Sequence, residues 1–123
     1  MKTIRYFILT GILILAASFS GPMATISWDF TEHDFGEIAK NNPVTVDFTF
    51  NNPGMVPLFI EEVKSSCGCT VPNYSKEPIP PGGSGKITVT YDAKISGYFS
   101  KTVTVIANTE EKISLLYIKG EVK

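Results

Sequence analysis

The two cysteines of the chain, Cys67 and Cys69, are the residues best suited to chemistry, and a single glycine separates them. Residues i and i+2 of an extended strand point to the same side, with Cα atoms about 6.6 to 7 Å apart. Disulfides prefer about 4.4 to 6.8 Å. A bond between the two sulfurs is therefore expected only where the chain bends. Gly68 is expected to provide that bend, because glycine tolerates positive φ.

The pair is a disulfide candidate with two further interpretations. A bond that closes three residues stabilises the fold by only about 1.6 kcal/mol through chain entropy, so it would be comparatively easy to reduce. Thiol oxidoreductases typically open a helix with Cys-x-x-Cys, and no helix signal follows Cys69. The residues favour structural cysteines at a loop or strand end, with thiol redox chemistry as one alternative.

Metal binding is the other alternative for the cysteines. Zinc requires four ligands, whereas two thiolates suit the soft ion Cu(I). His33, the one histidine of the chain, would join Cys67 and Cys69 only if the fold brought it beside them. Because His33 lies between Glu32 and Asp34, a solvated position at a strand end is the simpler expectation. We expect no cofactor, with Cu(I) as the alternative.

The other polar residues form no catalytic pattern. The serines lack the G-x-S-x-G elbow of serine hydrolases. The neighbouring acids Glu61 and Glu62, like Glu110 and Glu111, point to opposite faces of a strand and make no carboxylate pair. The glycine-rich segment 80–85 lacks the Lys-Ser/Thr ending of a phosphate loop. The sequence therefore predicts a protein that is not an enzyme.

The first twenty residues have the features of a secretory signal peptide. Lys2 and Arg5 form a basic start, residues 6–17 are apolar, and Ser18 and Ser20 offer a small-residue cleavage site. The apolar run is shorter than the roughly 20 residues that a membrane span requires. We predict a signal peptide over residues 1–20, with an uncleaved anchor as the alternative. The mature chain is then periplasmic or secreted, has no membrane span, and holds its thiols in an oxidising space.

The charge of the chain limits its partners. The whole sequence has 11 basic and 12 acidic residues and a net charge of −1. Without Lys2 and Arg5, nine basic residues face twelve acidic ones, so the mature part is near −3. A mildly acidic domain without a basic cluster argues against nucleic acid or an anionic membrane surface. The expected partner is another protein of the envelope or the extracellular space, and the sequence indicates no particular oligomeric state.

Apolar and polar residues alternate with period two along the rest of the chain, which is typical of strands with one buried face. The alternation slips between Ile60 and Val63, which predicts a bulge. The run 113–122 is denser and predicts a central strand covered on both faces. The segment 65–83 is the longest irregular stretch and the first candidate for a binding surface. The predicted strands cover residues 26–30, 35–39, 44–50, 57–63, 86–92, 99–108 and 113–122.

About seven strands, polar turns and no helical period predict one all-β domain over residues 26–123, an antiparallel β-sandwich of immunoglobulin type. A small Greek-key barrel is the alternative. The two cysteines are too close in sequence to bridge two sheets, so the core must hold by packing alone. Four aromatic residues are candidates either for an exposed patch or for the core: Trp28, Tyr74, Tyr98 and Phe99.

These residues resemble a bacterial family of exported, uncharacterised domains marked by a Ser-Cys-Gly-Cys-Thr motif and common in Bacteroidetes-like organisms. Its fold is similar to that of the Hydin-type immunoglobulin-like domains. The motif corresponds here to Ser66, Cys67, Gly68, Cys69 and Thr70. The matching segments are HDFGEI (33–38), VDFTFNNPG (46–54), PLFIEEVKSSCGCTVP (57–72, which holds the motif), PIPPGGSGKITVTYD (78–92), GYFSKTVTVIAN (97–108) and LYIKGEV (116–122).

The resemblance implies the fold and the export and carries no assigned reaction. We therefore expect an exported, non-enzymatic immunoglobulin-like module that binds a partner or serves a structural role. The alternative is a periplasmic thiol redox or Cu(I)-binding protein that acts through Cys67 and Cys69.

Overall fold

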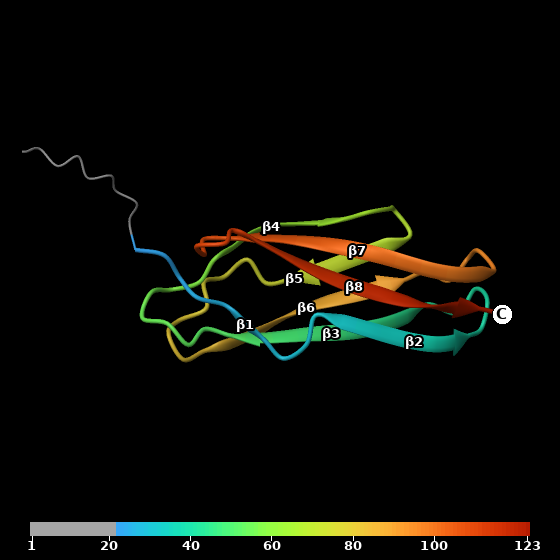
Figure 1. The fold of residues 1–123 in the computed structure, drawn as a ribbon, viewed down its shortest axis with the longest axis horizontal. Coiled ribbons are helices and arrows are strands. Elements are labelled where there is room, and N and C mark those ends of the chain that lie inside the picture. The colour runs from blue at the N-terminus through green and yellow to red at the C-terminus, as the bar shows by residue number, and fades with distance from the viewer. Residues whose placement is uncertain (1–21) are drawn as a thin grey trace, which may run out of the picture.

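The computed structural model describes residues 22–123, which form two four-stranded sheets packed face to face (Figure 1). The first sheet has the order β1-β3-β6-β5 and the second β2-β8-β7-β4. The all-β sandwich class is confirmed. The strands are β1 (Ser27–Trp28), β2 (Glu32–Ile38), β3 (Val44–Asn51), β4 (Ile60–Ser65), β5 (Thr70–Tyr74), β6 (Ser84–Tyr91), β7 (Gly97–Ala107) and β8 (Ile113–Val122).

The signal peptide predicted for residues 1–20 lies outside the described residues. Within residues 22–123, no helix is long and apolar enough to cross a membrane.

Alternation with period two predicts the strands because every second side chain enters the space between the sheets. In β3, Phe48 and Phe50 are buried, while Thr45 and Asp47 face solvent. Aromatic rings from the two sheets also contact each other: the ring of Tyr91 in β6 stacks on that of Phe99 in β7, with centroids 3.9 Å apart. Fully buried apolar side chains fill the centre of this core: Phe48, Leu58, Ile87, Val89, Val103, Leu116 and Ile118.

The edge formed by β4 and β5 confirms one prediction and corrects another. The register of β4 against β7 shifts between Ile60 and Glu62, where the sequence predicted a bulge. The segment 65–83, expected to be irregular, instead contains β5, which pairs with β6. Pro72 lies in the middle of β5 and hid this strand in the sequence. Proline is tolerated there because β5 is an edge strand.

The pairing of β2 with β8 departs from the expected antiparallel arrangement. Only residues 29–31 separate β1 from β2, so the chain changes sheets without reversing direction. β1 runs antiparallel to β3, and β2 continues the same way beside β8, which gives a parallel pair. Figure 1 shows β1 and β2 following one another along the same side of the sandwich.

β8 is central in its sheet, as predicted, but the expectation that both of its faces are covered is wrong. Leu116 and Ile118 point into the core and are fully buried. On the opposite face, Ile113, Leu115 and Tyr117 are 51%, 42% and 39% exposed. We call these three residues the outer stripe.

Candidate functional site

Cys67 and Cys69 lie in the turn that carries the chain from β4 in one sheet to β5 in the other, and the structure joins them by a disulfide. Their Cα atoms are 5.3 Å apart, closer than in a strand. The chain bends because the Thr70 amide donates to the Cys67 carbonyl over 3.3 Å. Gly68 is not among the positive-φ glycines of the described chain. The expectation that Gly68 bends the chain through positive φ is therefore wrong.

Backbone and hydroxyl groups hold this turn against both sheets. Ser66 and Thr102 of β7 exchange two bonds: the Ser66 amide donates to the Thr102 carbonyl at 2.9 Å, and the Thr102 amide donates to Ser66 Oγ at 3.1 Å. The Asp92 amide, just after β6, donates to the Cys69 carbonyl at 3.0 Å. The turn is thus fixed independently of the bond between the sulfurs.

Thr70 is the motif residue whose surroundings are most unusual. It is only 2% exposed, and its Oγ1 lies 3.8 Å from the sulfur of Cys67 and 3.8 Å from that of Cys69. Cys69 packs against the apolar core, and both cysteines remain partly exposed. A buried hydroxyl therefore faces both atoms of a partly accessible disulfide. The motif contained Thr70, but no pattern in the sequence indicated that it contacts both sulfurs.

His33 lies far from the cysteines in the order of the sheets. It belongs to β2, at one edge of the second sheet, whereas the cysteines follow β4, at the opposite edge. Its ring meets the ring of Phe35 at 4.6 Å between centroids. The structure does not assemble the possible Cu(I) ligand set of Cys67, Cys69 and His33. Among the described residues, no three His, Cys, Asp or Glu side chains are grouped to hold a metal ion.

The outer stripe continues onto β7. In the pairing of β7 with β8, Ile113 is opposite Ile106. Leu115 is opposite Thr104, and Tyr117 is opposite Thr102. Ile106 is itself partly exposed. The sequence did not indicate this surface, because a dense apolar run is also the pattern of a strand buried on both faces.

The outer face of the first sheet carries the exposed Val71 at its β5 edge, but its centre on β3 and β6 is polar and makes its own hydrogen bonds. Thr45 and Thr90 face each other across β3 and β6 with hydroxyl oxygens 3.0 Å apart. Thr88 donates to Asp47 at 2.7 Å, and Lys86 lies 3.5 Å from the same carboxylate. The Thr88 bond is the main cause that holds the pKa of Asp47 below its ordinary value, and Lys86 acts in the same direction. The central strands of the two sheets therefore differ on their outer faces: β3 and β6 present polar side chains, whereas β8 presents the outer stripe.

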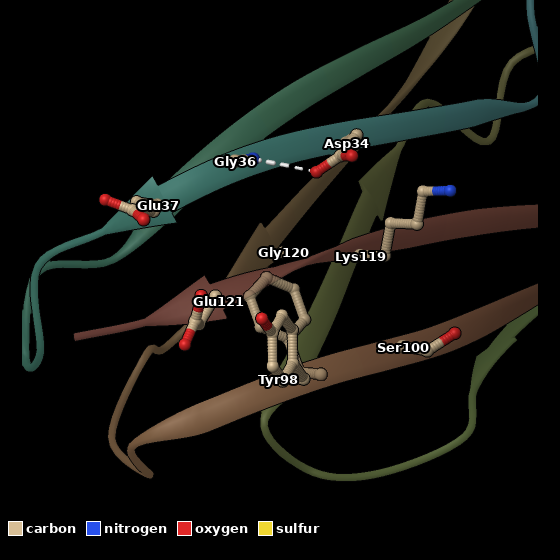
Figure 2. Close-up of a pocket in the computed structure, with 9 residues that line it drawn as sticks. Asp34, Gly36, Glu37, Tyr98, Ser100, Lys119, Gly120 and Glu121 are labelled. Carbon is tan, nitrogen blue, oxygen red and sulfur yellow. Dashed lines mark hydrogen bonds between the residues drawn. The ribbon is translucent and has the colours of Figure 1, made fainter.

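A shallow hollow of about 400 Å³ lies beyond the outer stripe, where β2, β7 and the end of β8 meet (Figure 2). It forms where the register of β2 shifts between Asp34 and Glu37. Gly36 adopts a φ of 71° there and donates its amide to Asp34 Oδ1 at 2.8 Å. Tyr98 borders the hollow and is 85% exposed, whereas the other aromatic candidates, Trp28, Tyr74 and Phe99, are partly or fully buried.

Two four-stranded sheets packed face to face define an immunoglobulin-like β-sandwich. No curated protein matches the chain significantly in sequence. The chain belongs to the family described as "Protein of unknown function (DUF1573)", whose model matches residues 26–122.

Solved structures of low sequence identity share the fold. A protein of unknown function from Porphyromonas gingivalis W83 superposes with a TM-score of 0.67 at 18% identity, covering 80% of this chain and 46% of that one. The ASH / PapD-like domain 7 of human CEP192 superposes with a TM-score of 0.69 at 9% identity, covering 93% and 96%. The VesB protease of Vibrio cholerae gives 0.61 at 13% identity, covering 82% and 32%. The chain thus spans about half or less of the two bacterial proteins.

Proposed function

We propose that this chain is an exported, non-enzymatic binding module that docks another envelope or extracellular protein on the outer face of its second sheet. The observation that carries the proposal is the outer stripe: three consecutive outward positions of a central strand are apolar and exposed. Covering apolar surface stabilises a complex by about 25 cal/mol per Å² removed from water, before the costs of association.

The surroundings of the outer stripe support a protein partner. On one side Lys119 pairs with Glu32 at 3.1 Å, and on the other Lys64 pairs with Glu62 at 3.6 Å. An apolar centre bordered by charged groups of both signs is the usual composition of a protein–protein interface. The hollow beyond it is open to solvent, which suits a broad protein surface better than an enclosed small molecule.

The other parts of the proposal rest on the sequence. Export is supported by the signal-like residues 1–20, and a partner other than nucleic acid by the mildly acidic charge. The Hydin-type assignment within the immunoglobulin-like class is supported by the segments that resemble that family, and the sandwich is compatible with it.

A photoreactive amino acid placed at Leu115 tests the docking face in the native cell. Thr45, exposed on the outer face of the first sheet, is the matched control position. We expect a discrete adduct with another protein from position 115 and none from position 45. Substituting Tyr117→Ser should weaken that adduct while the fold is retained. Equal adducts from both positions, or none from position 115, would contradict the proposal.

A further inference from the structure

We propose that the Cys67–Cys69 disulfide is a thiol–disulfide exchange site, and that the buried hydroxyl of Thr70 holds the thiolate that leaves when the bond opens. The inference is independent of docking on the outer stripe, because the turn 66–69 lies at the β4–β5 edge. The chemical partner is a dithiol, either a protein or a small molecule.

The position of the bond argues against a role as a staple. It closes a loop of three residues, so it constrains the unfolded chain less than a bond between distant residues does. The same turn is already tied to β7 through Ser66 and Thr102, and to the end of β6 through Asp92. Opening the bond therefore leaves the turn attached to both sheets.

Thr70 supplies the second observation. A valine would fill the same buried volume without the cost of burying a hydroxyl. That hydroxyl lies 3.8 Å from each sulfur, and within the described residues these sulfurs are its side-chain partners. A neutral disulfide sulfur accepts a hydrogen bond weakly, whereas a thiolate accepts it strongly. The hydroxyl is therefore of most use when the bond is broken.

The direction of exchange follows from the packing. Cys69 packs on the core beside Thr70, so Cys67 is the sulfur that the incoming thiolate of the dithiol attacks. A bond forms between that thiolate and Cys67 Sγ, the Cys67–Cys69 bond breaks, and the electron pair leaves on Cys69 Sγ. The second thiolate of the dithiol then attacks the dithiol sulfur that is bonded to Cys67. The bond between that sulfur and Cys67 breaks, and Cys67 leaves as a thiolate. Both cysteine thiolates take protons from water, and the partner leaves as a disulfide after giving up two electrons.

The variant Thr70→Val, with Thr70→Ser as the conservative control, tests the role of the hydroxyl. In reduced protein, we expect Thr70→Val to raise the lowest cysteine pKa by about one unit, which is tenfold in the equilibrium between thiol and thiolate. The equilibrium constant for reduction of the bond by dithiothreitol, measured at a pH where Cys69 is ionised, should fall by a similar factor in Thr70→Val. Thr70→Ser should retain both values. Unchanged values in Thr70→Val would overturn the assigned role.

The wild-type protein provides a measurement that requires no variant. We expect dithiothreitol to open the bond while circular dichroism and hydrogen exchange report an intact sandwich. A bond that opens only when the sandwich unfolds would overturn the exchange site.

Discussion

Trp28 of β1 donates a hydrogen bond from its indole Nε1 to the hydroxyl of Ser114 in β8, at 3.1 Å. The two strands belong to different sheets, so the bond passes from one layer to the other. The indole ring also meets the ring of Phe50 edge-on, with centroids 5.1 Å apart. This polar contact ties the short strand β1 to the start of β8 in the opposite sheet.

Removing the acceptor of this bond should destabilise the fold. Ser114→Ala leaves the indole N–H of Trp28 partly buried and unpaired, and we expect a loss of about 1 kcal/mol in the free energy of unfolding. Urea denaturation measures the change. Ser100→Ala, at an exposed outward position of β7, is the control and should be neutral. Equal effects of the two substitutions would mean that the bond contributes nothing.

Asn52 should be among the most sensitive polar residues. It is fully buried; its side-chain amide donates to the carbonyls of Val56 at 2.8 Å and Ile79 at 3.0 Å, and its Oδ1 accepts from the Gly54 amide at 3.0 Å. Asn52→Ala leaves the Val56 carbonyl and the Gly54 amide without these partners and removes one of the two donors to the Ile79 carbonyl, which keeps the Leu58 amide. We therefore expect a loss of about 3 kcal/mol. Thermal denaturation compares it with Asn73→Ala, at an exposed position of β5. A loss no larger than in that control would refute the prediction.

Two glycines should respond oppositely to alanine. A Cβ on Gly120 would lie 2.9 Å from the Gly36 carbonyl oxygen and 2.9 Å from the Phe99 ring, so Gly120→Ala should cost about 1 to 3 kcal/mol. A Cβ on Gly68 meets nothing within 4 Å, and its φ is not positive. Gly68→Ala should be neutral or stabilise by up to about 1 kcal/mol. Chemical denaturation of both variants checks the contrast, and strong destabilisation by Gly68→Ala would contradict it.

Loss of both cysteines should leave the fold intact. Cys67→Ser combined with Cys69→Ser removes the bond that closes a three-residue loop. We therefore expect the free energy of unfolding to decrease by less than about 2 kcal/mol. Equilibrium unfolding against the oxidised wild type measures it. Failure of the double variant to fold would show that the turn depends on its bond.

The titration of Asp47 should depend on Thr88. A carboxyl with a lowered folded-state pKa adds stability above its unfolded pKa, and this contribution is lost as the pH falls through the folded value. Thr88→Val should raise the pKa of Asp47 towards its ordinary value and reduce the loss of stability on acidification. NMR titration of the carboxyl checks this, with Thr45→Val as the control, since Thr45 bonds Thr90 instead. An unchanged pKa in Thr88→Val would assign the shift to Lys86.

The fold could be predicted from the sequence largely because alternation with period two is a local signal. The β3 run Val44–Asn51 follows it from end to end, and its inward residues are the buried ones. β5 was missed because Pro72 is unfavourable inside a sheet, and only the position of β5 at an edge makes it acceptable. Whether a strand is an edge strand depends on distant pairings that alternation does not encode.

The candidate site was predictable only in part. The spacing of Cys67 and Cys69 identified the disulfide candidate, but the groups that hold their turn, such as Thr102 and Asp92, come from strands far along the chain. The outer stripe was hidden for a related reason. Dense apolar residues in residues 113–122 indicate a central strand, and nothing local distinguishes a covered face from an open one.

The parallel pairing of β2 with β8 has a consequence for biosynthesis. β2 is among the first strands of this domain to be synthesised, and its neighbour in the sheet is the final strand of the domain, β8. Until β8 has been made, β2 has no hydrogen-bonding neighbour in its sheet and β7 lacks the strand that separates it from β2. Completion of the sandwich must therefore be a late event, after nearly all of the domain has been synthesised.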